Sequence, residues 1–108
     1  MQQLRQRHDD VHEHDDINEL VHELRKAGLR FEQQRRIAVR YDGIVVGEYV
    51  ADLLIEDAIL VETKTVKLLD DIHMAQCLNY LKATGLELCL LINFGTPKVK
   101  VQRIINNR

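Results

Sequence analysis

Hydrophobic residues recur at helical spacing in two separate segments of the chain. Intervals of three and four residues place such positions on one face of an α-helix. An aspartate precedes each segment and a glycine follows it, as expected for helix caps. We therefore predict helices over residues 16–27 and 71–84. The apolar positions are Ile17, Leu20, Val21 and Leu24 in the first segment, and Met74, Cys77, Leu78 and Leu81 in the second.

Alternating and continuous apolar runs in the rest of the chain are typical of β-strands. Asp42-Gly43 gives a tight-turn signal between two of these runs, and Gly47 suits a bulge. The central runs are apolar on both faces, so the sheet should be flanked by helices on both faces. The order predicts one α/β domain with a mixed sheet of about four or five strands. The expected strands cover residues 37–41, 44–55, 58–65, 88–93 and 99–104.

Composition and charge narrow the class of protein. The chain has 108 residues, of which 45% are hydrophobic and 30% are charged, and its formal net charge is −2. This composition fits one globular domain and lacks the basic excess of a free-standing nucleic-acid binder. The sequence has no apolar run of membrane-spanning length and no signal peptide, so we expect a cytoplasmic protein. Cys77 and Cys89 lack metal-type spacing and are expected to be reduced core thiols.

Two polar segments leave their roles open. Residues 1–15 form a segment rich in histidine and aspartate that precedes the predicted domain of residues 16–108. Such a tail is typically solvated, but its histidine density would also suit Zn²⁺ or Ni²⁺. Near the C-terminus, Lys98, Lys100 and Arg103 form either an exposed basic face or a set of phosphate contacts. The histidines of the N-terminal segment are His8, His12 and His14.

Three ionisable side chains interrupt strands that otherwise have a buried pattern. Asp52 lies in one predicted strand, and Glu62 and Lys64 lie in the next, where their spacing points both to one face of the sheet. A two-residue loop between these strands would place Asp52 on the wrong face from Glu62. A three-residue loop, Glu56 to Ala58, would place Asp52 directly opposite Glu62. We predict the three-residue loop, because it groups all three charges on one face.

Four sequence segments carry a family resemblance. They are residues 47–57, which contain Asp52, then Val61-Glu-Thr-Lys64, residues 73–81, which contain Gln76, and Leu90-Leu-Ile-Asn-Phe-Gly95. Together they resemble the PD-(D/E)XK nuclease superfamily and its small bacterial branch, the GxxExxY proteins. The resemblance covers roughly residues 23–105. It implies a restriction-endonuclease-like core and the hydrolysis of DNA or RNA.

Chemistry explains why these residue types would occur together. Burying such charges costs several kcal/mol unless they pair or bind a metal. Asp52 and Glu62 can share one Mg²⁺ or Mn²⁺, with the carbonyl of Thr63 and water completing the shell. Lys64 would then position the attacking water or stabilise the charge that develops on the phosphate. The resemblance further implies that Gln76 orients this lysine or contacts a phosphate, and that Glu13 adds a carboxylate from the first helix.

A non-catalytic module is the alternative interpretation. In it, Lys64 forms a structural ion pair with Glu62 or Asp52, and the domain binds nucleic acid or a protein partner. Asp10 and Asp16 replace the glycine and the tyrosine of the branch's first motif, which favours this alternative. The leading hypothesis is a Mg²⁺-dependent phosphodiesterase that gains its specificity from a homodimer or from a protein partner.

Overall fold

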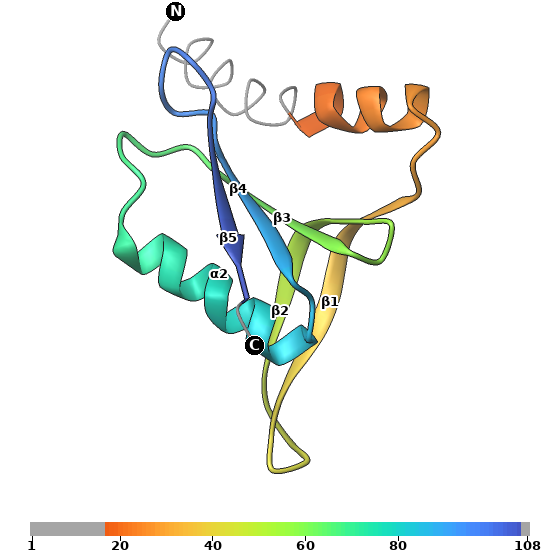
Figure 1. Cartoon of the computed structure of the whole chain (residues 1–108), viewed down its shortest axis with the longest axis vertical. Coiled ribbons are helices and arrows are strands. Elements are labelled where there is room, and N and C mark those ends of the chain that lie inside the picture. The colour runs from red at the N-terminus through yellow and green to blue at the C-terminus, as the bar shows by residue number, and fades with distance from the viewer. Residues whose placement is uncertain (1–16, 107–108) are drawn as a thin grey trace, which may run out of the picture. The chain divides into compact units, whose positions relative to one another are not determined.

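The computed structural model describes residues 17–106, and Figure 1 shows its elements. Residues 17–26 are helical, as predicted, and five strands and a second helix follow. The predicted order of elements is confirmed. No helix in this part of the chain is long and apolar enough to cross a bilayer. The elements are β1 (Phe31–Tyr41), β2 (Ile44–Ile55), β3 (Ile59–Lys64), α2 (Asp71–Thr84), β4 (Leu88–Asn93) and β5 (Lys100–Ile105).

The chain divides into two compact units, residues 1–30 and residues 31–108. The first unit contains the helix of residues 17–26, which ends in a turn where the N–H of Gly28 donates to the carbonyl of Arg25 at 3.0 Å. The second unit contains all five strands and α2. The predicted domain boundary after residue 15 lies outside the described residues.

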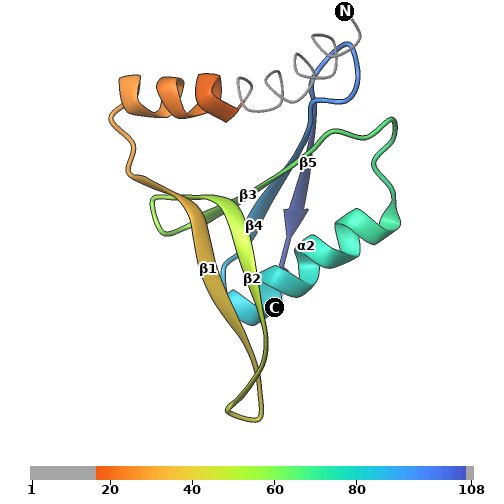
Figure 2. The same cartoon turned by 180° about the vertical axis from the view of Figure 1, so that it is seen from behind.

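The strands form one mixed sheet in the spatial order β1-β2-β3-β4-β5. β3 and β4 pair in parallel, and the other neighbouring strands are antiparallel. A parallel pair needs a crossover connection, and α2 supplies it by lying across one face of the sheet (Figures 1 and 2). The mixed sheet confirms the predicted α/β fold class. The core between α2 and the sheet consists of Ala51, Leu54, Leu60, Cys77, Leu81, Cys89, Leu91 and Ile104.

The β1–β2 hairpin closes at the predicted turn. Asp42 and Gly43 both have positive φ angles, of 52° and 77°, which two-residue hairpin turns require and glycine adopts at little cost. The pairing register shifts where Val39 pairs with Gly47 and Arg40 with Val45, so β2 carries one extra residue there. The bulge predicted at Gly47 is therefore confirmed.

The β2–β3 loop has three residues, as predicted. Ile55 pairs with Ile59, and the N–H of Ala58 donates to the carbonyl of Ile55 at 2.9 Å. Glu56 and Asp57 turn the chain with φ angles of 53° and 52°. Continuing this register brings the residues of β2 that precede Leu53 alongside the end of β3 that carries Glu62 and Lys64. The loop length therefore decides which polar residues can meet.

α2 begins and ends at the residues that the sequence predicts. The Asp70 carboxylate accepts hydrogen bonds from the N–H groups of Ile72 and His73, at 3.1 and 3.2 Å. The N–H of Asp70 in turn donates to His73 Nδ1, which completes a capping box. At the other end Gly85 has a φ of 76° and donates to the carbonyl of Leu81 at 2.8 Å. These caps fix the length of the crossover.

Candidate functional site

The Asp52 carboxylate lies where β2 and β3 stop pairing. The ladder between these strands runs from Ile55–Ile59 to Leu53–Val61. At the next position Asp52 Oδ2 accepts two hydrogen bonds from Thr63, one from its N–H at 2.8 Å and one from Oγ1 at 2.9 Å. The side chain thus replaces the missing ladder partner of the Thr63 N–H. These bonds hold the carboxylate in one position beside β3.

The ladder between β1 and β2 is distorted at the level of Asp52. Gln33 pairs with Leu53 and Arg35 with Ala51, while Gln34, between them, has a φ of 53°. A left-handed conformation costs a residue other than glycine about 1–2 kcal/mol. Backbone strain of this kind is concentrated at functional sites. Gln34 and Asp52 are the two residues between these pairs, so the strained backbone lies at the level of Asp52.

The Glu62 side chain is buried and incompletely satisfied. Glu62 is 8% exposed, and its Oε1 atom has no hydrogen-bond partner. Burial, and next the negative charge of Asp52, raise the pKa of Glu62 to about 8. Lys64 and a backbone hydrogen bond from Asp52 lower this pKa, but they do not cancel the effect of burial. A buried carboxyl oxygen without a partner is an acceptor that a donor or a cation would satisfy.

Lys64 ends β3 and lies beside Asn93 of β4, with which it pairs. Its positive charge lowers the pKa of Glu62, so the ammonium group acts on this carboxyl. Among residues 17–106, however, no salt bridge within 4 Å joins Lys64 to Asp52 or to Glu62. The structural ion pair of the non-catalytic alternative is therefore not formed in this structure.

Two stacked tyrosines lie close to Glu62. The rings of Tyr49 and Tyr80 are parallel within 6°, with centroids 3.5 Å apart. The Tyr49 hydroxyl is buried without a hydrogen-bond partner. Burial and the charge of Glu62 raise the pKa of both tyrosines. Sequence reasoning assigned no site role to this pair, because Tyr49 comes from β2 and Tyr80 from α2, and only the fold brings them together.

Gln76 lies on the exposed side of α2, one turn before Tyr80. A hydrogen bond from Gln76 lowers the pKa of Tyr80, so the amide is near the tyrosine hydroxyl. The predicted contact between Gln76 and Lys64 is not among the hydrogen bonds of residues 17–106. Its role toward the lysine or a phosphate stays a prediction.

The chain that follows Lys64 is held in place by Asn93. Asn93 is 1% exposed and bonds both backbone groups of Val66, accepting from its N–H at 3.1 Å and donating to its carbonyl at 2.9 Å. The N–H of Gly95 donates to the same Asn93 Oδ1 at 2.9 Å, and the N–H of Phe94 donates to the Lys64 carbonyl at 2.8 Å. Asn93 therefore fixes the path of the backbone next to Lys64. An asparagine at the end of an apolar strand is the sequence signal that could have revealed this role.

Replacing Gly95 by alanine should destabilise the domain by about 1–3 kcal/mol. An added Cβ would overlap the Val66 carbonyl oxygen and lie 2.8 Å from the Val66 carbonyl carbon. Val66 cannot move away without breaking its two bonds to Asn93. Thermal unfolding measures the loss, and Gly47→Ala is the matched control, since a Cβ there meets nothing within 4 Å. Equal midpoints for the two variants would contradict the close backbone contact.

The donor set suits a hard cation. No group of three or more His, Cys, Asp or Glu side chains within residues 17–106 is placed to hold a metal ion. Mg²⁺ typically binds only one or two carboxylates and keeps several waters. Asp52 and Glu62 can supply these, because both hydrogen bonds of Asp52 fall on Oδ2 and Glu62 Oε1 has no partner. The Thr63 carbonyl stays a predicted ligand, and Glu13 and the N-terminal histidines lie outside the described residues.

Comparisons with known proteins agree with this fold. Two solved structures are similar in fold. The crystal structure of SSO0001 has a TM-score of 0.60 and 18% identity over 87% of this chain. An alkaline exonuclease from Laribacter hongkongensis, LHK-Exo, has a TM-score of 0.62 and 15% identity over 85% of it. This chain spans about half of each, 51% and 55% of their lengths.

A search of curated proteins found no match. The model of one family, the PD-(D/E)XK nuclease superfamily, matches residues 12–104. This range covers most of the chain and contains both carboxylates, the lysine and Gln76. The protein therefore belongs to the PD-(D/E)XK nuclease superfamily.

Proposed function

We propose that this protein is a nuclease that uses Mg²⁺, or Mn²⁺ in its place, to hydrolyse phosphodiester bonds of DNA or RNA. The observation that carries the proposal is the buried Glu62 Oε1, which has no partner and lies next to the fixed carboxylate of Asp52. A buried carboxyl group whose pKa is raised by burial and by a neighbouring carboxylate forms with it a site that a divalent cation stabilises. Membership of the superfamily supports the same chemistry.

Each residue of the site has a separate task. When bound, a divalent ion polarises the phosphodiester and lowers the pKa of water. Asp52 and Glu62 hold the ion, and the two bonds from Thr63 keep Asp52 in place for it. The Lys64 ammonium, free of a salt bridge within the described residues, is available to a phosphate oxygen as negative charge develops there. Two further side chains have auxiliary roles in this proposal. Gln76 orients Lys64 or contacts a phosphate, and Glu13 adds a carboxylate.

Recognition of a long nucleic acid needs contacts beyond the residues that bind the metal. One structural relative is an alkaline exonuclease, and this chain spans 55% of it. The described residues form one sheet with α2 and one further helix, and contain no separate recognition domain. We therefore propose that a second copy or a protein partner supplies specificity. From the resemblance of its four sequence segments, we also propose that the chain belongs to the GxxExxY branch.

Titration with Mn²⁺ by calorimetry, on the wild type and on Asp52→Asn, tests the function. The amide keeps the shape of the side chain and still accepts from Thr63, but it is a weaker ligand. We expect the wild type to bind Mn²⁺ and Asp52→Asn to bind it at least about tenfold more weakly. Cleavage of single-stranded and double-stranded DNA and RNA is measured in parallel. Asp71→Asn, at an exposed acid on α2, is the control and should behave as the wild type.

The outcomes separate the two interpretations. Mn²⁺ binding that depends on Asp52, together with cleavage, establishes the nuclease. Mn²⁺ binding without cleavage of any of these substrates points to the partner as the missing component. A wild type that binds no Mn²⁺ contradicts the proposal and leaves the non-catalytic module.

A further inference from the structure

Three residues form a row across the ends of β3, β4 and β5. Lys64 pairs with Asn93, and Asn93 pairs with Lys100. Paired residues of neighbouring strands share one face of a sheet, so both lysines lie on the face that carries Asn93. Two strand spacings separate them, which is about 10 Å. The row continues the proposed catalytic site sideways, from Lys64 toward the edge of the sheet.

A cavity of about 250 Å³ opens along this row. Its walls come from the loop after β3, the first turns of α2, and β5. Asn93 forms part of the lining and fixes the loop through Val66. The two lysines that line the cavity are Lys67 and Lys100, and neither forms a salt bridge among the described residues. The other lining residues include Leu68, Leu69 and Met74.

We infer that this cavity binds one unpaired nucleotide of the substrate strand, next to the phosphate that is cleaved. The inference rests on the proposed function and specifies its substrate class as single-stranded nucleic acid. Leu68, Leu69 and Met74 offer an apolar surface to the faces of a base. Lys67 and Lys100 offer positive charge to its phosphate. A volume just under the roughly 300 Å³ of the smallest drug-sized pockets suits a ligand of this size.

The geometry favours an unpaired base over a paired one. A base in a duplex is stacked on both faces and bonded along its edge, so it can enter a side pocket only after leaving the helix. A single strand or a frayed end meets no such cost. Leu68 is 78% exposed and lies in the wall, so a large apolar side chain faces solvent where a base would stack.

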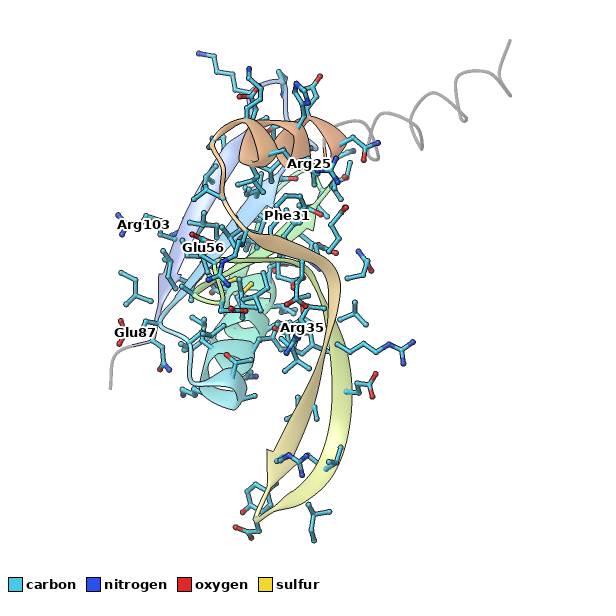
Figure 3. All side chains as sticks on the ribbon, turned by 90° about the vertical axis from the view of Figure 1, so that its right-hand side faces the viewer. Arg25, Phe31, Arg35, Glu56, Glu87 and Arg103 are labelled. Atoms are coloured by element: carbon cyan, nitrogen blue, oxygen red, sulfur yellow. The ribbon has the colours of Figure 1, made fainter. Side chains whose placement is uncertain are left out.

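Arg103 provides a contrast on the same strand. It is exposed, and Figure 3 shows it extending outward from β5. It lies next to Ile104, which packs against α2, so Arg103 points to the other face of the sheet. The three basic residues that the sequence grouped together, Lys98, Lys100 and Arg103, therefore do not all lie on one face of the sheet. Arg103 carries the same charge as Lys100 without access to the cavity.

Binding of labelled oligothymidine, measured by fluorescence anisotropy in metal-free buffer, tests the inference. Two competitors are an abasic strand of equal length and a duplex. We expect the wild type to bind oligothymidine at least about fivefold more tightly than the abasic strand. The slope of log affinity against log salt concentration should become shallower by about 0.7 per lysine in the double variant Lys67→Ala/Lys100→Ala. Leu68→Ala should reduce the preference for bases and leave binding of the abasic strand unchanged.

Arg103→Ala is the charge-matched control and should retain the preference for bases. Equal affinity of the wild type for the abasic strand and oligothymidine would overturn the inference, as would a double variant that matches Arg103→Ala. Mn²⁺ binding is measured separately and does not depend on these lysines. A protein that binds Mn²⁺ and cleaves nucleic acid but shows no base preference refutes the cavity alone. A base preference without any Mn²⁺ binding refutes the proposed function and retains the cavity.

Discussion

Replacing Glu62 by glutamine is expected to abolish metal-dependent cleavage and to stabilise the fold in the same molecule. The change preserves the size of the side chain but removes a metal ligand. A bound metal stabilises the charge of the transition state by several kcal/mol. Cleavage should therefore fall at least about a hundredfold. Burial raises the pKa of Glu62 from 4.5 to about 8. At pH 7 this shift lowers the free energy of unfolding by on the order of 3 kcal/mol. Glutamine avoids that cost, and the free energy of unfolding should rise by up to this amount.

Urea denaturation in metal-free buffer and cleavage kinetics with Mn²⁺ measure the two effects. Glu87→Gln changes an exposed carboxylate between α2 and β4 and should alter neither. A Glu62→Gln variant that loses stability together with activity would contradict the argument. That result would mean that the Glu62 carboxylate stabilises the fold through an ion pair, as in the non-catalytic alternative.

The register of β2 and β3 was predictable because one local choice determined it. Glu56 and Asp57 had turn character, and only a three-residue loop grouped the charges of the two strands on one face. The structure confirms the pairing of Ile55 with Ile59. The caps of α2 were predictable for the same reason, since Asp70 and Gly85 bond to groups within four residues of themselves.

Features that depend on long-range packing were not predictable. Tyr49 and Tyr80 are 31 residues apart in sequence and stack only because α2 crosses the sheet. The regular alternation of β2 also breaks around Asp52, since Ala51 and Leu54 face the same core although an ideal strand would separate them. Strand periodicity gives no sign of that break. The raised pKa of Glu62 likewise depends on its burial and on groups from other elements, Asp52 of β2 and Cys77 of α2.

The metal-free wild type should lose stability as the pH rises from about 4.5 to about 8. Folded Glu62 holds a proton in this range and the unfolded chain releases it, because the pKa is raised on folding to about 8. Folding therefore takes up a proton, and each pH unit lowers the free energy of unfolding by up to about 1.4 kcal/mol. The total over the range is on the order of 4 kcal/mol, and above pH 8 the dependence on Glu62 ends. Glu62→Gln should lack this component, and the difference between the two pH profiles isolates it from other carboxylates.

Divalent metal should reverse the loss. Mn²⁺ binds the ionised carboxylate, so it competes with the proton and is most effective at the upper end of the range, near pH 8. At one hundred times its dissociation constant it should raise the free energy of unfolding of the wild type by about 2.7 kcal/mol. Glu62→Gln should gain far less from Mn²⁺ at any pH. If Mn²⁺ stabilised both proteins equally, the ion would bind elsewhere, and the buried carboxyl would be a structural acid. A gain confined to the wild type, and larger at pH 8 than at pH 5, requires that one group binds both the proton and the metal.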